Sequence, residues 1–179
     1  VFIDVSGGNV HFALINGTDS CDDPTTKSII RYNRVCNIGS MGSYIDANSA
    51  SAGSRDNVIY NNTWVSLSEG THSTWQTYAH AYSASADSSG INNIFIDAMH
   101  HSGATGFNWK SGGAQSHNLY YDPDNSMTFS GLASSETGAV KNLDPLVNDP
   151  FNNDFSLNAG SPAIDAGGPL TRVAAADTG

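Results

Sequence analysis

The residues best suited to chemistry are carboxylates, imidazoles, ammonium groups and aromatic rings within three short β-forming runs, 43–47, 77–84 and 106–110. One outward stripe along these runs would contain Asp46, Tyr78, His80, Tyr82, Asn108 and Lys110. Aromatic faces pack on sugar rings, and a Lys or His that titrates near neutral pH can remove a proton beside a uronate carboxyl group. We therefore predict His80 and Lys110 as catalytic groups and the other four as substrate-binding residues. A register slip of one residue would instead turn His80 and both tyrosines into the core.

A second candidate site is the run Asp122-Pro123-Asp124-Asn125-Ser126, which places carboxylates at alternating positions. Calcium is a hard cation that takes oxygen ligands, so Asp122 and Asp124 could bind Ca²⁺. The run lacks the Gly and terminal Glu of a helix-loop-helix calcium loop. An Asx-Pro turn accounts for the same residues without any metal. Both interpretations remain open, and we expect no other cofactor.

Composition and charge narrow the classes of partner. The formal net charge is −10, with only seven Lys plus Arg among 179 residues. Such a chain has no basic patch to neutralise phosphates, so we expect no nucleic-acid partner. No apolar run approaches the ~20 residues that a membrane-spanning helix needs, so we expect no membrane span. The sequence leaves the oligomeric state open.

The elements that must hold these residues follow from a repeat. A polar turn, a β-forming residue and a large side chain recur, and Asn62, Asn93 and Asn118 fall in one column. With Arg34 counted as the first member, the intervals are 28, 31 and 25 residues. A unit of this size cannot bury its own apolar face, whereas stacked units can. Stacking predicts ladders of Asn amides and an aromatic stack of Trp64, Phe95 and Tyr120.

An all-β class suits the low charged fraction of 13% and the many Gly, Asn and Ser residues. A β-sandwich would have strands every 8 to 12 residues, but it does not explain the Asn column. We expect a second strand in each repeat near residues 43–47, 77–84, 106–110 and 126–130, and loops at 66–76 and 131–140. Cys21 and Cys36 could form a disulfide or remain two small buried hydrophobes.

The C-terminal segment carries a resemblance to a known family. Its motifs occur in the order Asp144-Pro145-Leu146, Asp154-Phe155-Ser156-Leu157 and Gly160-Ser161-Pro162-Ala163-Ile164-Asp165-Ala166-Gly167. This order closely resembles the end of bacterial right-handed parallel β-helix repeat proteins of the pectate-lyase-like superfamily. Residues 176–179 resemble the start of the D-x-G-A-Y-E ending of these proteins, so we expect the chain to be a C-terminal portion.

The resemblance implies an all-β, right-handed, single-stranded parallel β-helix, with coils over 1–143 and a capping segment of the same domain over 144–179. The apolar residues expected to cover the last coil are Leu146, Val147, Phe155, Leu157 and Ile164. The family implies an extracellular, periplasmic or cell-surface location and a polysaccharide partner. We expect binding and cleavage by a lyase or a glycoside hydrolase, or alternatively a noncatalytic adhesive module. Few basic residues weaken the lyase version, because its substrate is a polyanion.

Overall fold

The computed structural model is built from short, mostly parallel strands. It describes residues 11–16, 29–36, 41–46, 58–65, 79–82, 89–96, 106–108, 115–123, 125, 128–131 and 136–170. Within these ranges the helical content is one short 3-10 turn, η1 (Pro150–Asn152). The described chain is thus strand-rich with almost no helix, in keeping with an all-β fold. None of its described helical segments is long and apolar enough to cross a membrane.

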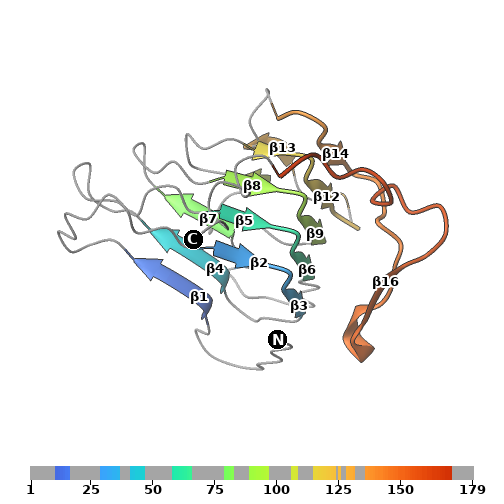
Figure 1. Cartoon of the computed structure of the whole chain (residues 1–179), viewed down its shortest axis with the longest axis horizontal. Helices are drawn as coiled ribbons and strands as arrows, with labels where there is room; N and C mark the ends of the chain where they lie inside the picture. Colours follow the sequence, from blue (N-terminus) through green and yellow to red (C-terminus); the bar gives the residue numbers. More distant parts are fainter. Residues whose placement is uncertain are drawn as a thin grey trace.

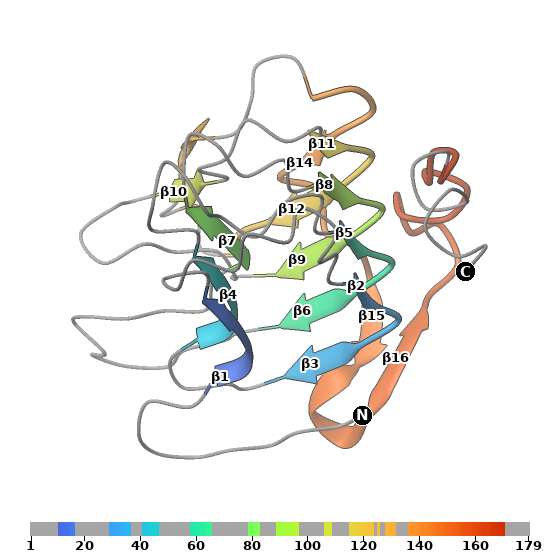
Figure 2. The ribbon, with the colours of Figure 1, turned by 60° about the vertical axis from the view of Figure 1, so that its left-hand side comes forward.

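Two parallel sheets meet along a line of turns (Figures 1 and 2). The first sheet holds the strands that precede each turn: β2 (Ile29–Arg31), β5 (Val58–Tyr60), β8 (Ser89–Ile91) and β11 (Gln115–Ser116). The second holds the strands that follow it: β3 (Arg34–Cys36), β6 (Thr63–Val65), β9 (Ile94–Ile96), β12 (Leu119–Tyr121) and β14 (Val140–Lys141). Each strand pairs in unshifted register with its equivalents in adjacent repeats.

Further parallel strands lie in two smaller sheets. One has the order β1 (His11–Asn16), β4 (Met41–Asp46), β7 (Ala79–Tyr82), and the other pairs β10 (Gly106–Asn108) with β13 (Thr128–Gly131). The predicted second strand of each repeat is confirmed, because β4, β7, β10 and β13 overlap the four expected runs. The strands that precede the turns were not predicted. Most of them have three residues, too few to show an alternating pattern.

A line of asparagine amides runs through the inside of the turns, and three of its members, Asn62, Asn93 and Asn118, are buried. The Nδ2 of Asn33, Asn62 and Asn93 donates to the Oδ1 of the asparagine in the following repeat, at 2.9 to 3.0 Å. Each of these oxygens also accepts the backbone N–H of the preceding asparagine, at 2.9 to 3.1 Å. The fourth member is Asn118. The predicted alignment of Asn62, Asn93 and Asn118 is confirmed, and hydrogen bonds join all three.

The first member of this asparagine ladder is Asn33. The prediction that Arg34 is the first member of the column is therefore wrong. Arg34 is the register partner of Thr63, one position past Asn62. The error arose from matching Tyr32 with Tyr60, because both are tyrosines followed by asparagine. In the structure Tyr32 belongs to the turn, and the sequence separations along the ladder are 29, 31 and 25.

Aromatic side chains fill the core behind the ladder. Trp64, Phe95 and Tyr120 are register partners on successive strands, and all are buried. The rings of Phe95 and Tyr120 stack with centroids 5.4 Å apart and planes 9° from parallel. Such a pair adds about 0.5–1.5 kcal/mol to the free energy gained by burial alone. The predicted alignment of three aromatic residues is therefore confirmed by the strand register.

The C-terminal segment forms an antiparallel hairpin of β15 (Val147–Asp149) and β16 (Asp154–Leu157). Phe155 is buried against Val65 and Ile96. Neighbouring strand residues point to opposite sides, so these two face away from the core that holds Trp64. The hairpin thus covers the outer face of the second sheet, beside which it lies in Figure 2. The prediction that Val147 and Phe155 cover the last coil is wrong, because both pack beside Val65 and Ile96 on the outer face of earlier strands. Ile164, predicted to cover the last coil too, is 47% exposed.

Replacing Asn93 with alanine should lower the free energy of unfolding by roughly 3 kcal/mol or more, because each buried polar group left without a partner costs about 1–3 kcal/mol. Asn93 accepts from Asn62 and donates to both the Asn118 Oδ1 and the Ile59 carbonyl. Urea denaturation measures the change. The exposed Asn158→Ala variant is the control and should shift the value by less than about 0.5 kcal/mol. Equal effects of the two substitutions would contradict a stabilising ladder.

Candidate functional site

Three predicted site residues share one face of the sheet formed by β4 and β7. Asp46 is the register partner of Tyr82, and Tyr44 is the partner of His80. Residues two apart occupy the same face of a strand, so the positions of His80 and Tyr82 share a face with that of Asp46. Partners on adjacent parallel strands lie about 4.8 Å apart. We call these three positions the β4–β7 face.

The other predicted members of the stripe are not joined to this face in the described structure. Asn108 ends β10, where its register partner is Gly131 of β13 in a separate sheet. Tyr78 and Lys110 lie outside the described residues. Cys21 lies outside them too, so the possible disulfide with Cys36 stays a prediction.

The proposed calcium site is described at Asp122 only, because Asp124 lies outside the described residues. Asp122 follows β12 and is 1% exposed. Its carbonyl accepts the backbone N–H of Asn125 at 3.3 Å, which closes a turn. Burial, and then the negative charges of Asp144 and Asp122, raise the pKa of Tyr121. No cluster of three or more His, Cys, Asp or Glu suited to a metal occurs among the residues described.

A second polar feature, which the sequence reasoning missed, runs along the outside of the turns. In each turn one residue adopts the left-handed conformation, with φ between 53° and 69°. Pairings on either side of the turns align these residues across the repeats. They form what we call the turn ridge: Tyr32, Asn61, Asn92, His117 and Gly138. Asn-Asn at 61–62 and 92–93 is the sequence signal, since Asn tolerates positive φ.

Residues 161–170, the C-terminal strap, cross this ridge. Asn92 Nδ2 donates to the carbonyl of Gly168 at 3.0 Å, and the Gly168 N–H donates to Asn92 Oδ1 at 2.8 Å. The His117 ring lies between Gly138 and Gly168. A Cβ added to Gly138 would lie 2.4 Å from its nearest ring atom, and one added to Gly168 would lie 2.2 Å from its own. Beyond the ridge, Leu170 packs against Tyr60 and Ile91.

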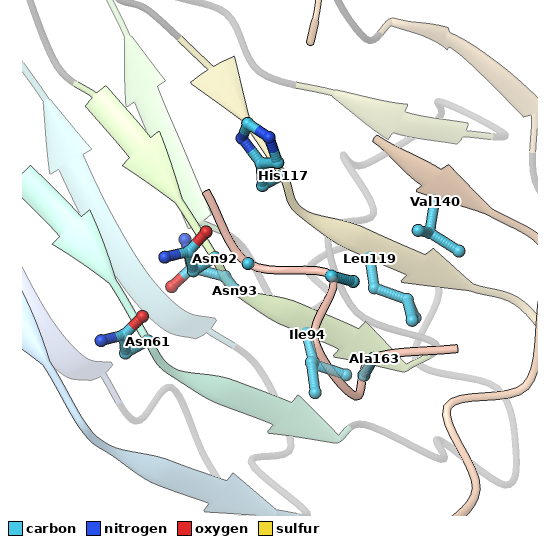
Figure 3. Close-up of a pocket in the computed structure, with 10 residues that line it drawn as sticks. Asn61, Asn92, Asn93, Ile94, His117, Leu119, Val140 and Ala163 are labelled. Atoms are coloured by element: carbon cyan, nitrogen blue, oxygen red, sulfur yellow. The ribbon is translucent and has the colours of Figure 1, made fainter. Parts of the chain in front are cut away.

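A hollow of about 220 Å³ remains between the strap and the ridge. Figure 3 shows Asn61, Asn92 and His117 on successive turns beside it. Ala163 and Ala166 of the strap also line it. Further apolar side chains come from the second sheet, at Ile94, Leu119 and Val140. The hollow therefore combines polar ridge groups with apolar ones.

Glu136 ends the asparagine ladder. Its Oε1 accepts from Asn118 Nδ2 at 2.8 Å, and its Oε2 accepts from the Tyr120 hydroxyl at 3.0 Å. Burial raises the pKa of Glu136, although the hydrogen bonds from Asn118 and Tyr120 and the charge of Lys141 offset part of this effect.

The prediction of a loop over 131–140 is wrong at its end, because residues 136–140 form another turn of the ridge. Gly138 before Ala139 and Val140 was the available signal.

Comparisons of the chain with models of known protein families, with curated proteins and with solved structures find no match.

The substitution Glu136→Gln should leave stability at neutral pH unchanged or raise it by up to about 1 kcal/mol. Glutamine keeps an acceptor for Asn118 and removes a partly buried charge. Since the pKa of Glu136 is raised by folding, its contribution to stability is fully present below the ordinary pKa of 4.5 and is lost as pH rises through the raised value.

Urea unfolding between about pH 4 and pH 7 measures this dependence. The difference in stability between the parent chain and Glu136→Gln should shift in favour of the parent as pH falls. Glu136→Ala, which removes the acceptor, should destabilise at every pH by about 1–3 kcal/mol. If the unfolding free energies of the parent and Glu136→Gln changed with pH in parallel, the raised pKa of Glu136 would be contradicted.

Gly168→Ala should destabilise the chain by about 1–3 kcal/mol, because the new Cβ would overlap the His117 ring. Removing that ring should relieve the overlap. In a His117→Gly background, which keeps a residue suited to positive φ, the cost of Gly168→Ala should fall by at least half. A double-mutant cycle of unfolding free energies tests the coupling. Additive effects would show that strap and ring do not meet.

Proposed function

We propose that the chain forms a right-handed parallel β-helix of the pectate-lyase-like kind, which binds and cleaves an extracellular polysaccharide. Unshifted parallel pairing supports this architecture, because stacked coils require each strand to meet its equivalent. The ladder from Asn33 to Asn118 supports it too, since only a stack of equivalent turns brings such amides together.

The register of the β4–β7 face carries the functional part of the proposal. It sets Asp46 beside Tyr82, with His80 on the same face. A carboxylate and an imidazole are suited to general acid–base catalysis, and an aromatic ring beside them is suited to stacking on a sugar. Successive strands repeat such positions along a sheet, as an extended polymeric substrate requires.

The reaction is either β-elimination by a lyase or hydrolysis of a glycosidic bond. In the lyase, His80 removes the proton from C5, the carbon beside the uronate carboxyl group. The C4–O bond then breaks as the C4=C5 double bond forms, and the leaving oxygen takes up a proton from water. In the hydrolase, Asp46 needs a second carboxylate about 5–10 Å away. The acidic charge of the chain favours a weakly charged polysaccharide over a dense polyanion.

A panel of polysaccharides tests the reaction class. Ultraviolet absorbance of unsaturated uronates reports elimination, whereas new reducing ends without that absorbance report hydrolysis. Binding with neither product would replace the enzyme by an adhesive module.

On a substrate that the chain cleaves, Asp46→Asn and His80→Ala should each lower the rate by about 100-fold or more, as loss of a general acid or base does. Asp165→Asn is the matched control, because Asp165 is exposed on the strap, distant in sequence, and has a positive φ that Asn accepts. Initial rates at saturating substrate give the comparison. Rates within twofold of the parent for both variants would remove the β4–β7 face from the mechanism.

A further inference from the structure

Tyr32 is unlike the other residues of the turn ridge. Asn, His and Gly tolerate the left-handed conformation, but a bulky aromatic residue does so at a cost. Tyr32 has φ 54° and is also 63% exposed, so its ring recovers little of that cost by burial. Two unfavourable features at one position point to a role other than stability, because strain of this kind is retained at functional sites.

The Tyr32 ring is held in place by its neighbours. It meets the buried Tyr60 ring edge-on, with centroids 5.6 Å apart and planes at 75°. The Arg31 guanidinium lies 6.0 Å from both ring centroids and donates to the Tyr60 hydroxyl at 2.8 Å. The exposed ring is therefore a preformed platform, which lowers the entropy lost when a ligand binds.

Asn61 follows Tyr32 along the ridge. Arg31 pairs with Tyr60, which places the next residues, Tyr32 and Asn61, about one strand spacing apart, roughly 4.8 Å. Asn61 lines the hollow beside the strap. Whereas the Asn92 amide is engaged by Gly168, that of Asn61 makes no hydrogen bond within the described part of the chain. It presents one donor group and one acceptor next to the aromatic platform.

We infer that Tyr32 and Asn61 form a sugar-binding subsite on the turn ridge, separate from the β4–β7 face. The ring of one sugar unit stacks on Tyr32, while a hydroxyl or acetamido group of the glycan hydrogen-bonds with the Asn61 amide. A flat aromatic face beside an uncharged donor and acceptor fits the alternating apolar faces and hydroxyl groups of a sugar. The class of ligand rests on the proposed function, but the subsite requires no cleavage.

Electrophoresis through gels that contain hydroxyethyl cellulose, xylan, galactomannan or polygalacturonate tests the subsite. At least one polymer should retard the parent chain. Tyr32→Asn should weaken that affinity about tenfold, because a stacking contact is lost. Tyr32→Trp should retain it. Asn61→Asp, which keeps the positive φ but removes the amide donor, should weaken affinity about threefold or more.

The variants distinguish lost binding from lost folding. Asn is the ridge's own residue type, so Tyr32→Asn should match or exceed the parent in thermal stability. Phe151→Asn is the matched control, because Phe151 is another exposed aromatic residue, at 48%, and lies on the hairpin. Its retardation should equal that of the parent.

Two outcomes would overturn the subsite: no polymer retards the parent chain, or Tyr32→Asn migrates as the parent does. Cleavage assays separate this result from the proposed function. Retardation that depends on Tyr32 without any cleavage supports the subsite and counts against the enzyme. Cleavage that depends on Asp46, together with retardation that is unchanged in Tyr32→Asn, supports the enzyme and counts against the subsite.

Discussion

The hydrogen-bonded amide ladder is the constraint on which the rest of the described structure depends. The side-chain oxygens of Asn62, Asn93 and Asn118 each accept two N–H groups from the repeat before, so each of these amides fixes the register of two turns at once. A slip of one residue would place Thr63 or Ile94 where an amide must sit and would leave buried groups without partners. The ladder therefore converts repeats of unequal length into sheets with one register.

The ladder also has a direction. Every Nδ2 group donates one hydrogen bond toward the following repeat, so the amide dipoles add, and the last forward bond runs from Asn118 to the carboxylate of Glu136. The Nδ2 groups of Asn93 and Asn118 also donate to the carbonyls of Ile59 and Gly90 in the repeat before. A negative group at the donor end of aligned dipoles gives a strong, charge-assisted hydrogen bond. The same position explains the raised pKa, because the carboxylate that completes the ladder has to be partly withdrawn from water. The contact between Glu136 and Asn118 thus has two opposite effects on stability. The hydrogen bond stabilises the stack, whereas the desolvation of the carboxylate destabilises it.

Sequence patterns predict the elements that repeat and fail for those that occur once. Asn62, Asn93 and Asn118 could be aligned because each stands between a turn residue and a β-forming residue, and the β4–β7 face followed from β-forming runs. Tyr32 broke the pattern, since tyrosine gives no signal for a left-handed turn, and the alignment slipped there. The pairing of Asn92 with Gly168 joins residues 76 positions apart through one side chain, and no periodicity encodes such a contact.

Coverage by the C-terminal segment decides which surfaces remain for a ligand. The outer face of the second sheet carries Val65 and Ile96, which would be costly to expose, and Phe155 converts it into a small core. The strap then crosses the ridge at Asn92 and His117, using the backbone of Gly168 because a side chain there would strike the imidazole. Two ridge residues come before that crossing: the Tyr32 ring stays exposed, and the Asn61 amide makes no hydrogen bond within the described chain. The described strap reaches Tyr60 and Ile91 through Leu170, while the Tyr32 ring stays exposed.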